Sequence, residues 1–157
     1  MAAFSIRPAV PGDQQALFGL IRALARFERL EEAVTGSAEE LGQHLFGAAA
    51  AGGRPLAEGL LAEVAGAPVG FALFFTNYST FLTRPGIYLE DLFVLEDHRR
   101  QGVGQALLAE VRRIAEARGA GRLEWTVLDW NADAIAFYRR IGADVLPDWR
   151  LCRVRLR

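Results

Sequence analysis

Residues 88–104 join an acidic, strand-like run to a basic loop that contains two glycines. Residues 88–94 read Tyr-Leu-Glu-Asp-Leu-Phe-Val, and residues 99–104 read Arg-Arg-Gln-Gly-Val-Gly. Gly102 and Gly104 allow a tight turn and the close approach of a ligand to the backbone. The helix predicted to begin there would direct its unpaired N–H groups and positive dipole end at the same place. The pattern indicates catalysis on a cofactor that carries phosphate.

Two common phosphate motifs do not fit this loop. A P-loop requires Gly-Lys-Ser/Thr at the start of the helix, but the chain has no lysine, and its 18 basic residues are all arginine. A dinucleotide fingerprint requires a third glycine or alanine where the sequence has Leu107, and also an early βαβ unit. An ordinary strand-to-helix loop remains the alternative at this stage.

The hydrophobic pattern predicts one α/β domain over residues 1–157, with a mixed sheet flanked by helices. Asp13 and Ser37 are predicted helix N-caps, the latter in a capping box with Glu40. The predicted helices cover 13–27, 37–47, 102–118 and 131–141. The predicted strands cover 4–8, 59–64, 69–76, 86–94, 123–128 and 150–156, with a further strand at 143–146 left open and a mobile loop over 47–53.

The motif Arg99-x-x-Gly102-x-Gly104 resembles the Arg/Gln-x-x-Gly-x-Gly/Ala motif of the GNAT superfamily of acyl-CoA-dependent N-acyltransferases. The chain more narrowly resembles the diamine (spermidine/spermine) N-acetyltransferases and their thialysine-acetylating relatives. Five segments carry this likeness: 4–9, 24–28, 31–32, 88–91 and 130–131. The resemblance implies a GNAT fold whose splayed central strands hold acyl-CoA, acetyl-CoA as co-substrate, and a homodimer.

Glu90 is the candidate general base. An alkylammonium with a pKa near 10.4 is neutral in roughly one molecule per few thousand at pH 7, so a positioned base matters. Strand alternation places Glu90 opposite to Leu89 and Asp91 across the sheet. In the resembled family the matching glutamate acts on the amine, often through water. The alternative is that Glu90 pairs with an arginine.

Tyr138 is the candidate acid. It follows Asn131 by seven residues, or two helical turns, so both would project from one helix face. In the resembled family the matching tyrosine protonates the departing CoA thiolate. The alternative is that Tyr138 only packs against the core.

The cofactor residues follow from the same segments. Backbone groups of Leu92, Phe93 and Val94 are expected to hold the pantetheine arm like an added strand, and to place an N–H near the thioester carbonyl. The predicted pyrophosphate loop comprises Arg99, Arg100, Gln101, Gly102, Val103, Gly104 and Gln105. The resemblance adds Asn131, Ala134 and Tyr138 to the acetyl-CoA contacts.

Acidic residues indicate a cationic acceptor. Glu28, Glu31 and Glu32 have the spacing of one helix face, where they would attract a polycation, although a solvated helix end would look the same. The resemblance implies that Glu28 binds the substrate. It gives the other substrate-binding residues as Phe27, Glu90, Glu124, Trp125, Thr126 and Asp148. The leading hypothesis for the acceptor substrate is a polyamine. A thialysine-like amino acid, another small amine or an aminated drug stays open as the acceptor, because loop 47–58 and the loop before Trp149 depart from the subfamily pattern.

The remaining features set limits. A net charge of −1 gives no general attraction for nucleic acid, and no apolar run approaches the ~18 residues of a membrane span. His44 and His98 are isolated, so no metal is implied, and Cys152 is expected to be a packed or edge-strand thiol. A cytoplasmic protein is expected. Two other functions remain: a protein or peptide acetyltransferase, and a non-catalytic acyl-CoA sensor, which the presence of both Glu90 and Tyr138 disfavours.

Overall fold

The computed structural model describes residues 3–47 and 53–156, and these form two compact units. The first unit comprises residues up to 125, and the second begins at residue 126. Most of the mobile loop expected over 47–53 lies outside the described residues.

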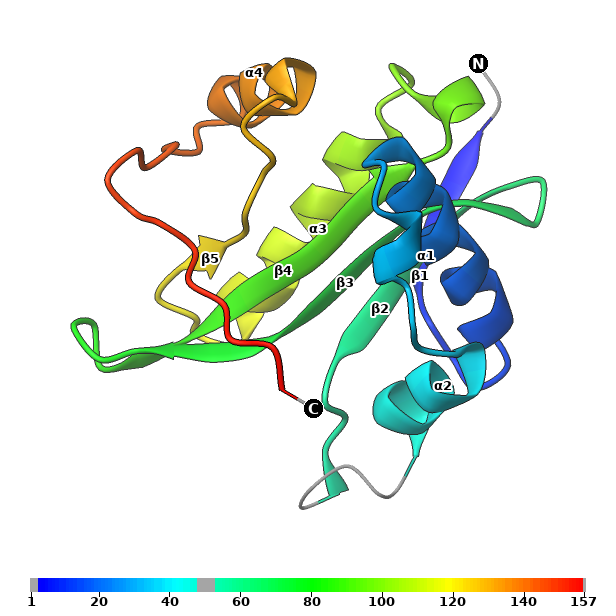
Figure 1. Cartoon of the computed structure of the whole chain (residues 1–157), viewed down its shortest axis with the longest axis horizontal. Helices are drawn as coiled ribbons and strands as arrows, with labels where there is room; N and C mark the ends of the chain where they lie inside the picture. The colour runs from blue at the N-terminus through cyan, green and yellow to red at the C-terminus, as the bar shows by residue number, and fades with distance from the viewer. Residues whose placement is uncertain (1–2, 48–52, 157) are drawn as a thin grey trace. The chain divides into compact units, whose positions relative to one another are not determined.

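A five-stranded sheet forms the centre of the first unit (Figure 1). Its strands are β1 (Phe4–Pro8), β2 (Glu58–Val64), β3 (Ala67–Ser79), β4 (Arg84–Val94) and β5 (Leu123–Glu124), in that spatial order. The first four are mutually antiparallel, whereas β5 runs parallel to β4. The predicted mixed sheet is therefore confirmed.

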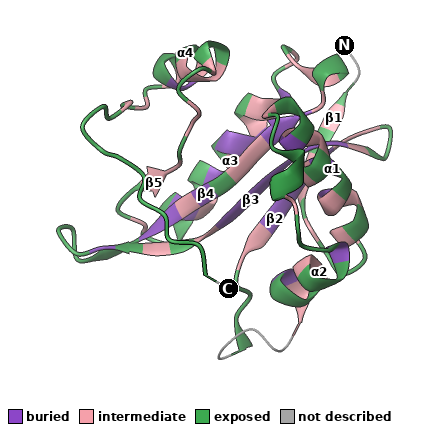
Figure 2. Ribbon diagram, in the orientation of Figure 1, coloured by how far each residue is buried: buried purple, intermediate pink, exposed green. Residues whose placement is uncertain are grey.

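Helices cover both faces of this sheet (Figure 1). The helices α1 (Gln14–Phe27) and α2 (Ala38–Phe46) lie on one face, and α3 (Val103–Ala117) packs across β1 to β4 on the other. The core on the α1 side is built from Leu17, Leu20, Leu45, Leu61, Phe71, Leu73 and Phe93. Figure 2 shows the buried residues concentrated in the central strands and on the inner side of α3.

The two predicted N-caps behave differently. The Ser37 side chain accepts a hydrogen bond from the Glu40 N–H at 3.1 Å, as the capping pattern predicted. Asp13 does precede α1, but its side chain does not cap the helix. Instead the Asp13 carboxylate accepts hydrogen bonds from the Arg7 guanidinium, the shorter at 2.6 Å. A charge-assisted, two-pronged pair is stronger than a neutral cap, which explains the difference.

The end of α1 separates three acidic residues that the sequence placed on one helix face. Arg29 adopts a left-handed conformation, with φ of 60°. The Leu30 N–H donates to the Ala25 carbonyl at 2.8 Å, and the Arg29 N–H donates to the Arg26 carbonyl at 3.1 Å. These two bonds form a Schellman motif, which ends the helix at Phe27.

The expectation that Glu28, Glu31 and Glu32 share one helix face is therefore wrong. Glu28 is the C-cap residue of α1, whereas the other two belong to a separate 3₁₀ helix, η1 (Glu31–Ala33).

The second unit contains α4 (Ala132–Arg140), which lies within the predicted helix 131–141, and Asn131 is its N-cap. The strand expected at 150–156 and the one left open at 143–146 do not form, and β5 has two residues instead of the predicted 123–128. A strand needs a neighbour for its hydrogen bonds, and apolar alternation alone does not supply one. Within the described residues, 150–156 is irregular and exposed. Cys152 is consequently exposed, contrary to the expected packed or edge-strand thiol.

Replacing Arg29 with glycine should stabilise the protein by about 1 kcal/mol, because glycine adopts a left-handed conformation without the steric cost that a Cβ imposes. Urea denaturation would measure the change. The matched control is Arg26→Gly in the last turn of α1, where glycine should instead cost about 1 kcal/mol. A loss of stability in Arg29→Gly would contradict the role given to this turn.

Candidate active site

A β-bulge in β4 lies at Glu90. Leu73 of β3 pairs with Asp91 and its neighbour Phe74 pairs with Leu89, so Glu90 has no partner on β3. One extra residue of this kind interrupts strand alternation. Because Phe74 and Leu73 face opposite sides of the sheet, Leu89 and Asp91 do too. The sequence had placed them on the same face, opposite to Glu90, and that prediction is wrong.

Asp91 is the titratable group that the bulge brings to the α1 side of the sheet. It shares a face with Leu73, which packs in the core beneath α1. The pKa of the Asp91 carboxyl is raised to about 7. Burial is the largest cause, and the negative charges of Glu90 and Glu28 are the smaller ones. Burial also raises the pKa of Glu28. No cation among the described residues offsets these charges at Asp91.

Glu28, Glu90 and Asp91 therefore form an acidic cluster, and we use this name for the three residues below. Sequence reasoning found Glu28 and Glu90 but missed Asp91, because strand alternation put it on the wrong face. The only sequence signal was a second carboxylate in a strand that is otherwise mainly apolar. Clustered acids without a cation favour a positively charged ligand, and a carboxyl with a pKa near 7 is suited to accept a proton at neutral pH.

The outer edge of β4 is open beyond Tyr88. In the part of the chain that the structure describes, β5 pairs only with Ile87 and Tyr88. The Leu95 N–H donates to the Val69 carbonyl on β3 at 2.9 Å. Since backbone groups alternate along a strand, Leu92 and Val94 present their N–H and C=O groups to the outer edge. This edge can hold an extended chain that contains amides.

Phe93 lies between these two residues and differs from them. It pairs with Phe71 of β3, and its ring is 7% exposed in the core beneath α1. Its backbone groups face β3 by the same alternation. Phe93 therefore supports the edge from within the core.

The glycine-bearing loop leads from η3 (Glu96–His98) into α3. Arg100 and Gly102 have φ of 60° and 85°, and Gly102 is the N-cap of α3 without a side-chain cap. The first N–H groups of α3 are thus left for a ligand, and the positive helix end favours an anion. The Gln101 side chain donates to the Asp97 carbonyl at 3.1 Å and so braces the loop.

The remaining loop residues differ in exposure. Val103 is buried, so only its backbone can reach a ligand, whereas Gln105 is exposed. A Cβ on Gly104 would lie 3.7 Å from Val94 Cγ2, an ordinary contact, which explains how alanine could also serve there. The Arg99 side chain is engaged elsewhere: its Nε donates to the Val94 carbonyl at 2.9 Å.

Three other predicted substrate residues, Phe27, Glu124 and Trp125, lie in the first unit. Phe27 is 38% exposed, and its ring lies 6.3 Å from that of Phe93. The Glu124 carboxylate is 2.7 Å from the Arg122 Nε, which partly offsets its charge. Trp125 follows directly and is half-buried.

The second unit holds Thr126, Asn131, Ala134, Tyr138 and Asp148. The Asn131 Oδ1 accepts from the Ala134 N–H at 3.3 Å, which caps α4. Tyr138 is the buried residue of α4, 9% exposed, with its ring 5.4 Å from that of Phe137. Asp148 is exposed. The candidate base and the candidate acid therefore belong to different units.

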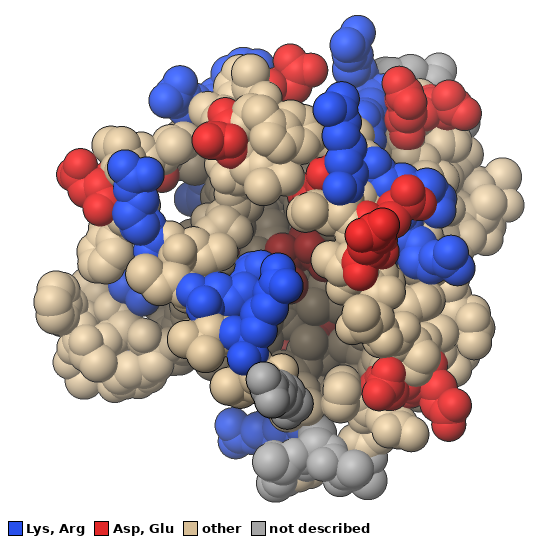
Figure 3. All heavy atoms as spheres, viewed as in Figure 1, with Lys and Arg blue, Asp and Glu red and all other residues tan. Residues whose placement is uncertain are grey.

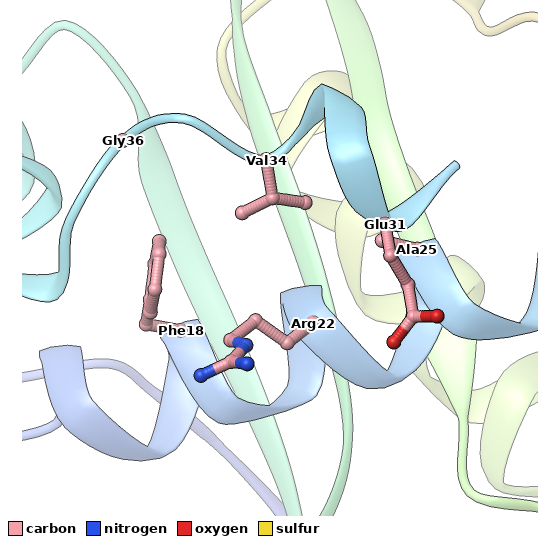
Figure 4. Close-up of a pocket in the computed structure, with 6 residues that line it drawn as sticks. All are labelled: Phe18, Arg22, Ala25, Glu31, Val34 and Gly36. Atoms are coloured by element: carbon pink, nitrogen blue, oxygen red, sulfur yellow. The ribbon is translucent and has the colours of Figure 1, made fainter. Parts of the chain in front are cut away.

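A separate hollow of about 200 Å³ lies beside α1 (Figure 4). Phe18 and Arg22 extend from α1, and Val34 comes from the segment after η1. Glu31 lines this hollow, whereas no member of the acidic cluster does. Glu31 and Glu28 are thus parts of different surfaces.

The face of the molecule drawn in Figure 3 shows no broad region of one charge. On the face shown in Figure 3, acidic and basic side chains are interspersed over the first unit. No helix in the described parts of the chain has the length and apolar character that a membrane crossing requires. Within residues 3–47 and 53–156 there is also no group of three His, Cys, Asp or Glu side chains arranged to hold a metal ion.

Comparisons with known proteins agree with this geometry. Residues 22–143 match the sequence profile of the acetyltransferase (GNAT) family. A thialysine N-epsilon-acetyltransferase of Bos taurus is 36% identical over 94% of this chain and 88% of its own length. An L-ornithine N5-acetyltransferase of Arabidopsis thaliana is 52% identical, over 54% of this chain and 37% of its own length. An aminoglycoside acetyltransferase from an uncultured soil metagenomic sample has the same fold, with a TM-score of 0.81 at 18% identity over 98% of this chain and 97% of its own.

Asp91→Asn should become more stable relative to the unmodified protein as pH rises from about 4 to 7. The Asp91 pKa is raised from 3.8 to about 7, so over this window the folded protein holds a proton that the unfolded chain releases, and the unmodified protein loses stability as pH rises. Since one pKa unit corresponds to about 1.4 kcal/mol, the relative gain is at most about 4 kcal/mol. Urea denaturation across this pH range would measure it.

Asp13→Asn is the matched control, because the Arg7 hydrogen bond lowers the Asp13 pKa. The stability supplied by Asp13 is present above its unfolded pKa and is lost as pH falls, so this variant should become relatively less stable as pH rises to about 4 and should show no further relative change from pH 4 to 7. If both variants changed in the same direction, the assignment of Asp91 as a buried, unpaired acid would be wrong.

Proposed function

Because the chain belongs to the acetyltransferase (GNAT) family, it is an acyl-CoA-dependent N-acetyltransferase, and we propose that it acetylates a primary amine of a small cationic molecule. The proposed donor is acetyl-CoA, and the proposed acceptor is a polyamine or diamine, or a thialysine-like amino acid. The observation that carries the proposal is the acidic cluster, in which the largely buried Asp91 lies near Glu28 and Glu90 without a cation.

Charge favours this class of acceptor. An ammonium group would relieve the mutual repulsion of the three carboxylates, and a second positive charge on the same chain would add to the attraction. The similar bovine and plant enzymes are named for thialysine and L-ornithine, which are small molecules with an amine. Glu31 and Glu32 lie apart in η1 and are not part of this proposal.

The proposed reaction is direct attack. The neutral amine attacks the thioester carbonyl, so a C–N bond forms and the C–S bond breaks. Glu90 accepts the proton that leaves the amine, directly or through water, and Asp91 is a second acceptor with a pKa near neutrality. The Tyr138 hydroxyl gives its proton to the departing CoA sulfur.

Three groups of residues are proposed to bind acetyl-CoA. The outward backbone groups of Leu92 and Val94 would bind the pantetheine arm and place an N–H near the thioester carbonyl. The loop of Arg100 to Gln105 and the uncapped start of α3 would bind pyrophosphate. In the second unit, Asn131 and Ala134 at the start of α4 would contact the arm.

A homodimer in the cytoplasm is also part of the proposal, supported by the subfamily resemblance. Large apolar side chains are exposed on the β3–β4 hairpin, with Phe81 at 99%, and in the C-terminal segment, with Val154 at 83%. Apolar surface of this kind often marks contact with another chain. Light scattering in solution would measure the mass of the assembly.

Tyr138→Phe should lower kcat for acetyl transfer by about 10²-fold, since acid catalysis typically contributes about 10²–10⁴-fold, while acetyl-CoA still binds. Steady-state release of CoA and calorimetric titration with acetyl-CoA would measure the two properties separately. Tyr78→Phe is the matched control, because Tyr78 is exposed on the β3–β4 hairpin. Unchanged turnover in Tyr138→Phe would remove it from the mechanism.

A panel of amines would test the acceptor. We expect spermidine, short diamines, thialysine and ornithine to be acetylated faster than an uncharged amine or an acidic peptide, because the acidic cluster attracts positive charge. Glu28→Gln should reduce kcat/KM for the dications more than for monocationic amines. Preference for a peptide acceptor would favour protein acetylation, and acetyl-CoA binding without transfer to any amine would favour an acyl-CoA sensor.

A further inference from the structure

We infer that Arg99 is a positioning residue for the acceptor side of the site, because its side chain ties the end of β4 to the end of α1 and thereby holds Glu28 beside Asp91. The inference rests on the proposed function, and it gives Arg99 a role other than that of a phosphate ligand.

The contacts of Arg99 reach two elements besides its own loop. Its Nε donates to the Val94 carbonyl at 2.9 Å, at the end of the open edge of β4. Its guanidinium carbon lies 4.5 Å from the centre of the Phe27 ring and 5.4 Å from that of Phe93. A planar guanidinium can stack on aromatic rings and donate sideways at the same time, which a lysine cannot do.

Phe27 links Arg99 to the acidic cluster through the backbone of α1. It is the last residue of α1, and Glu28 follows it as the C-cap. The Glu28 N–H donates to the Leu24 carbonyl at 2.9 Å, so the backbone of Glu28 is fixed to the last turn. The charge of Glu28 in turn acts on Asp91. A shift of Phe27 would therefore move Glu28 relative to Asp91.

Arg100 provides the contrast. It is exposed in the loop, has a φ of 60°, and follows Arg99 directly. An exposed arginine beside the uncapped helix start is suited to a phosphate, whereas Arg99 uses its Nε and the flat face of its guanidinium within the protein. The two arginines can thus be distinguished by experiment.

Arg99→Gln and Arg99→Ala separate positioning from charge. The glutamine Nε2 is attached to Cδ, as the arginine Nε is, so glutamine can keep the hydrogen bond to the Val94 carbonyl without the positive charge. If Arg99 acts by position, glutamine should recover part of what alanine loses. If Arg99 acts only as a cation on pyrophosphate, glutamine should be no better than alanine.

The kinetic experiment compares two acyl donors, acetyl-CoA and S-acetylpantetheine, which lacks the nucleotide and its phosphates. Arg99→Ala should raise KM for the amine by about tenfold with both donors, since a small misplacement of a binding group costs a factor of this order, and kcat should change less. Arg100→Ala should instead raise KM for acetyl-CoA more than KM for S-acetylpantetheine. A loss in Arg99→Ala confined to acetyl-CoA, with the amine KM unchanged, would overturn the inference.

A second measurement needs no ligand. Carbon-13 NMR titration of the Asp91 carboxyl in the free protein should show its pKa falling towards the ordinary range in Arg99→Ala, because Glu28 moves away and water enters. The Asp91 titration should return part of the way in Arg99→Gln. An Asp91 titration that is unaltered by Arg99→Ala would also overturn the inference. Failure of the proposed function would look different: the unmodified protein would transfer no acetyl group to any amine.

Discussion

The β-bulge at Glu90 is the constraint on which the site depends. β4 has to contribute core side chains to two helix layers, leave one edge open and present the Asp91 carboxyl on the α1 side. Regular alternation would put Leu89 and Asp91 on the same face, so one of these needs would fail. The extra residue reverses the alternation once, which keeps Leu89 1% exposed in the core and turns Asp91 towards α1.

The bulge also explains why acceptor chemistry and cofactor binding lie next to each other. Asp91 faces α1, while the following Leu92 and Val94 present backbone groups to the open edge. The residues proposed to bind the amine and those proposed to bind the pantetheine arm are therefore neighbours along β4. Arg99 strengthens this link, because it binds the Val94 carbonyl and the ring of Phe27 with one side chain.

The sequence predicted the features that depend on local chemistry. The Ser37 cap, the helix after Asn131 and the glycine-bearing loop before α3 each need only a few neighbouring residues of particular types, and these formed as expected. The turn after α1 was missed because Arg29 occupies a left-handed position that usually signals itself by glycine.

The other differences arise from contacts with distant residues. The bulge is a matter of register between β3 and β4, and nothing in the sequence of β4 alone reveals it. The expected strand at 150–156 had apolar alternation, but a strand forms only where a partner edge is available. The local sequence pattern therefore could not predict which face of the sheet Asp91 occupies, or that the C-terminal segment forms no strand.

The raised pKa of Asp91 has a chemical consequence for a cationic acceptor. Such an amine would enter as an ammonium and must lose a proton before it attacks. Moving a proton from an amine of pKa about 10.4 to a carboxyl of pKa 3.8 costs about 9 kcal/mol. For a carboxyl with the Asp91 pKa of about 7, the cost falls to about 5 kcal/mol. The burial that increasingly destabilises the free protein from about pH 4 to 7 thus reduces the barrier contribution of deprotonation, so the same acidic cluster can first attract the cation and then accept its proton.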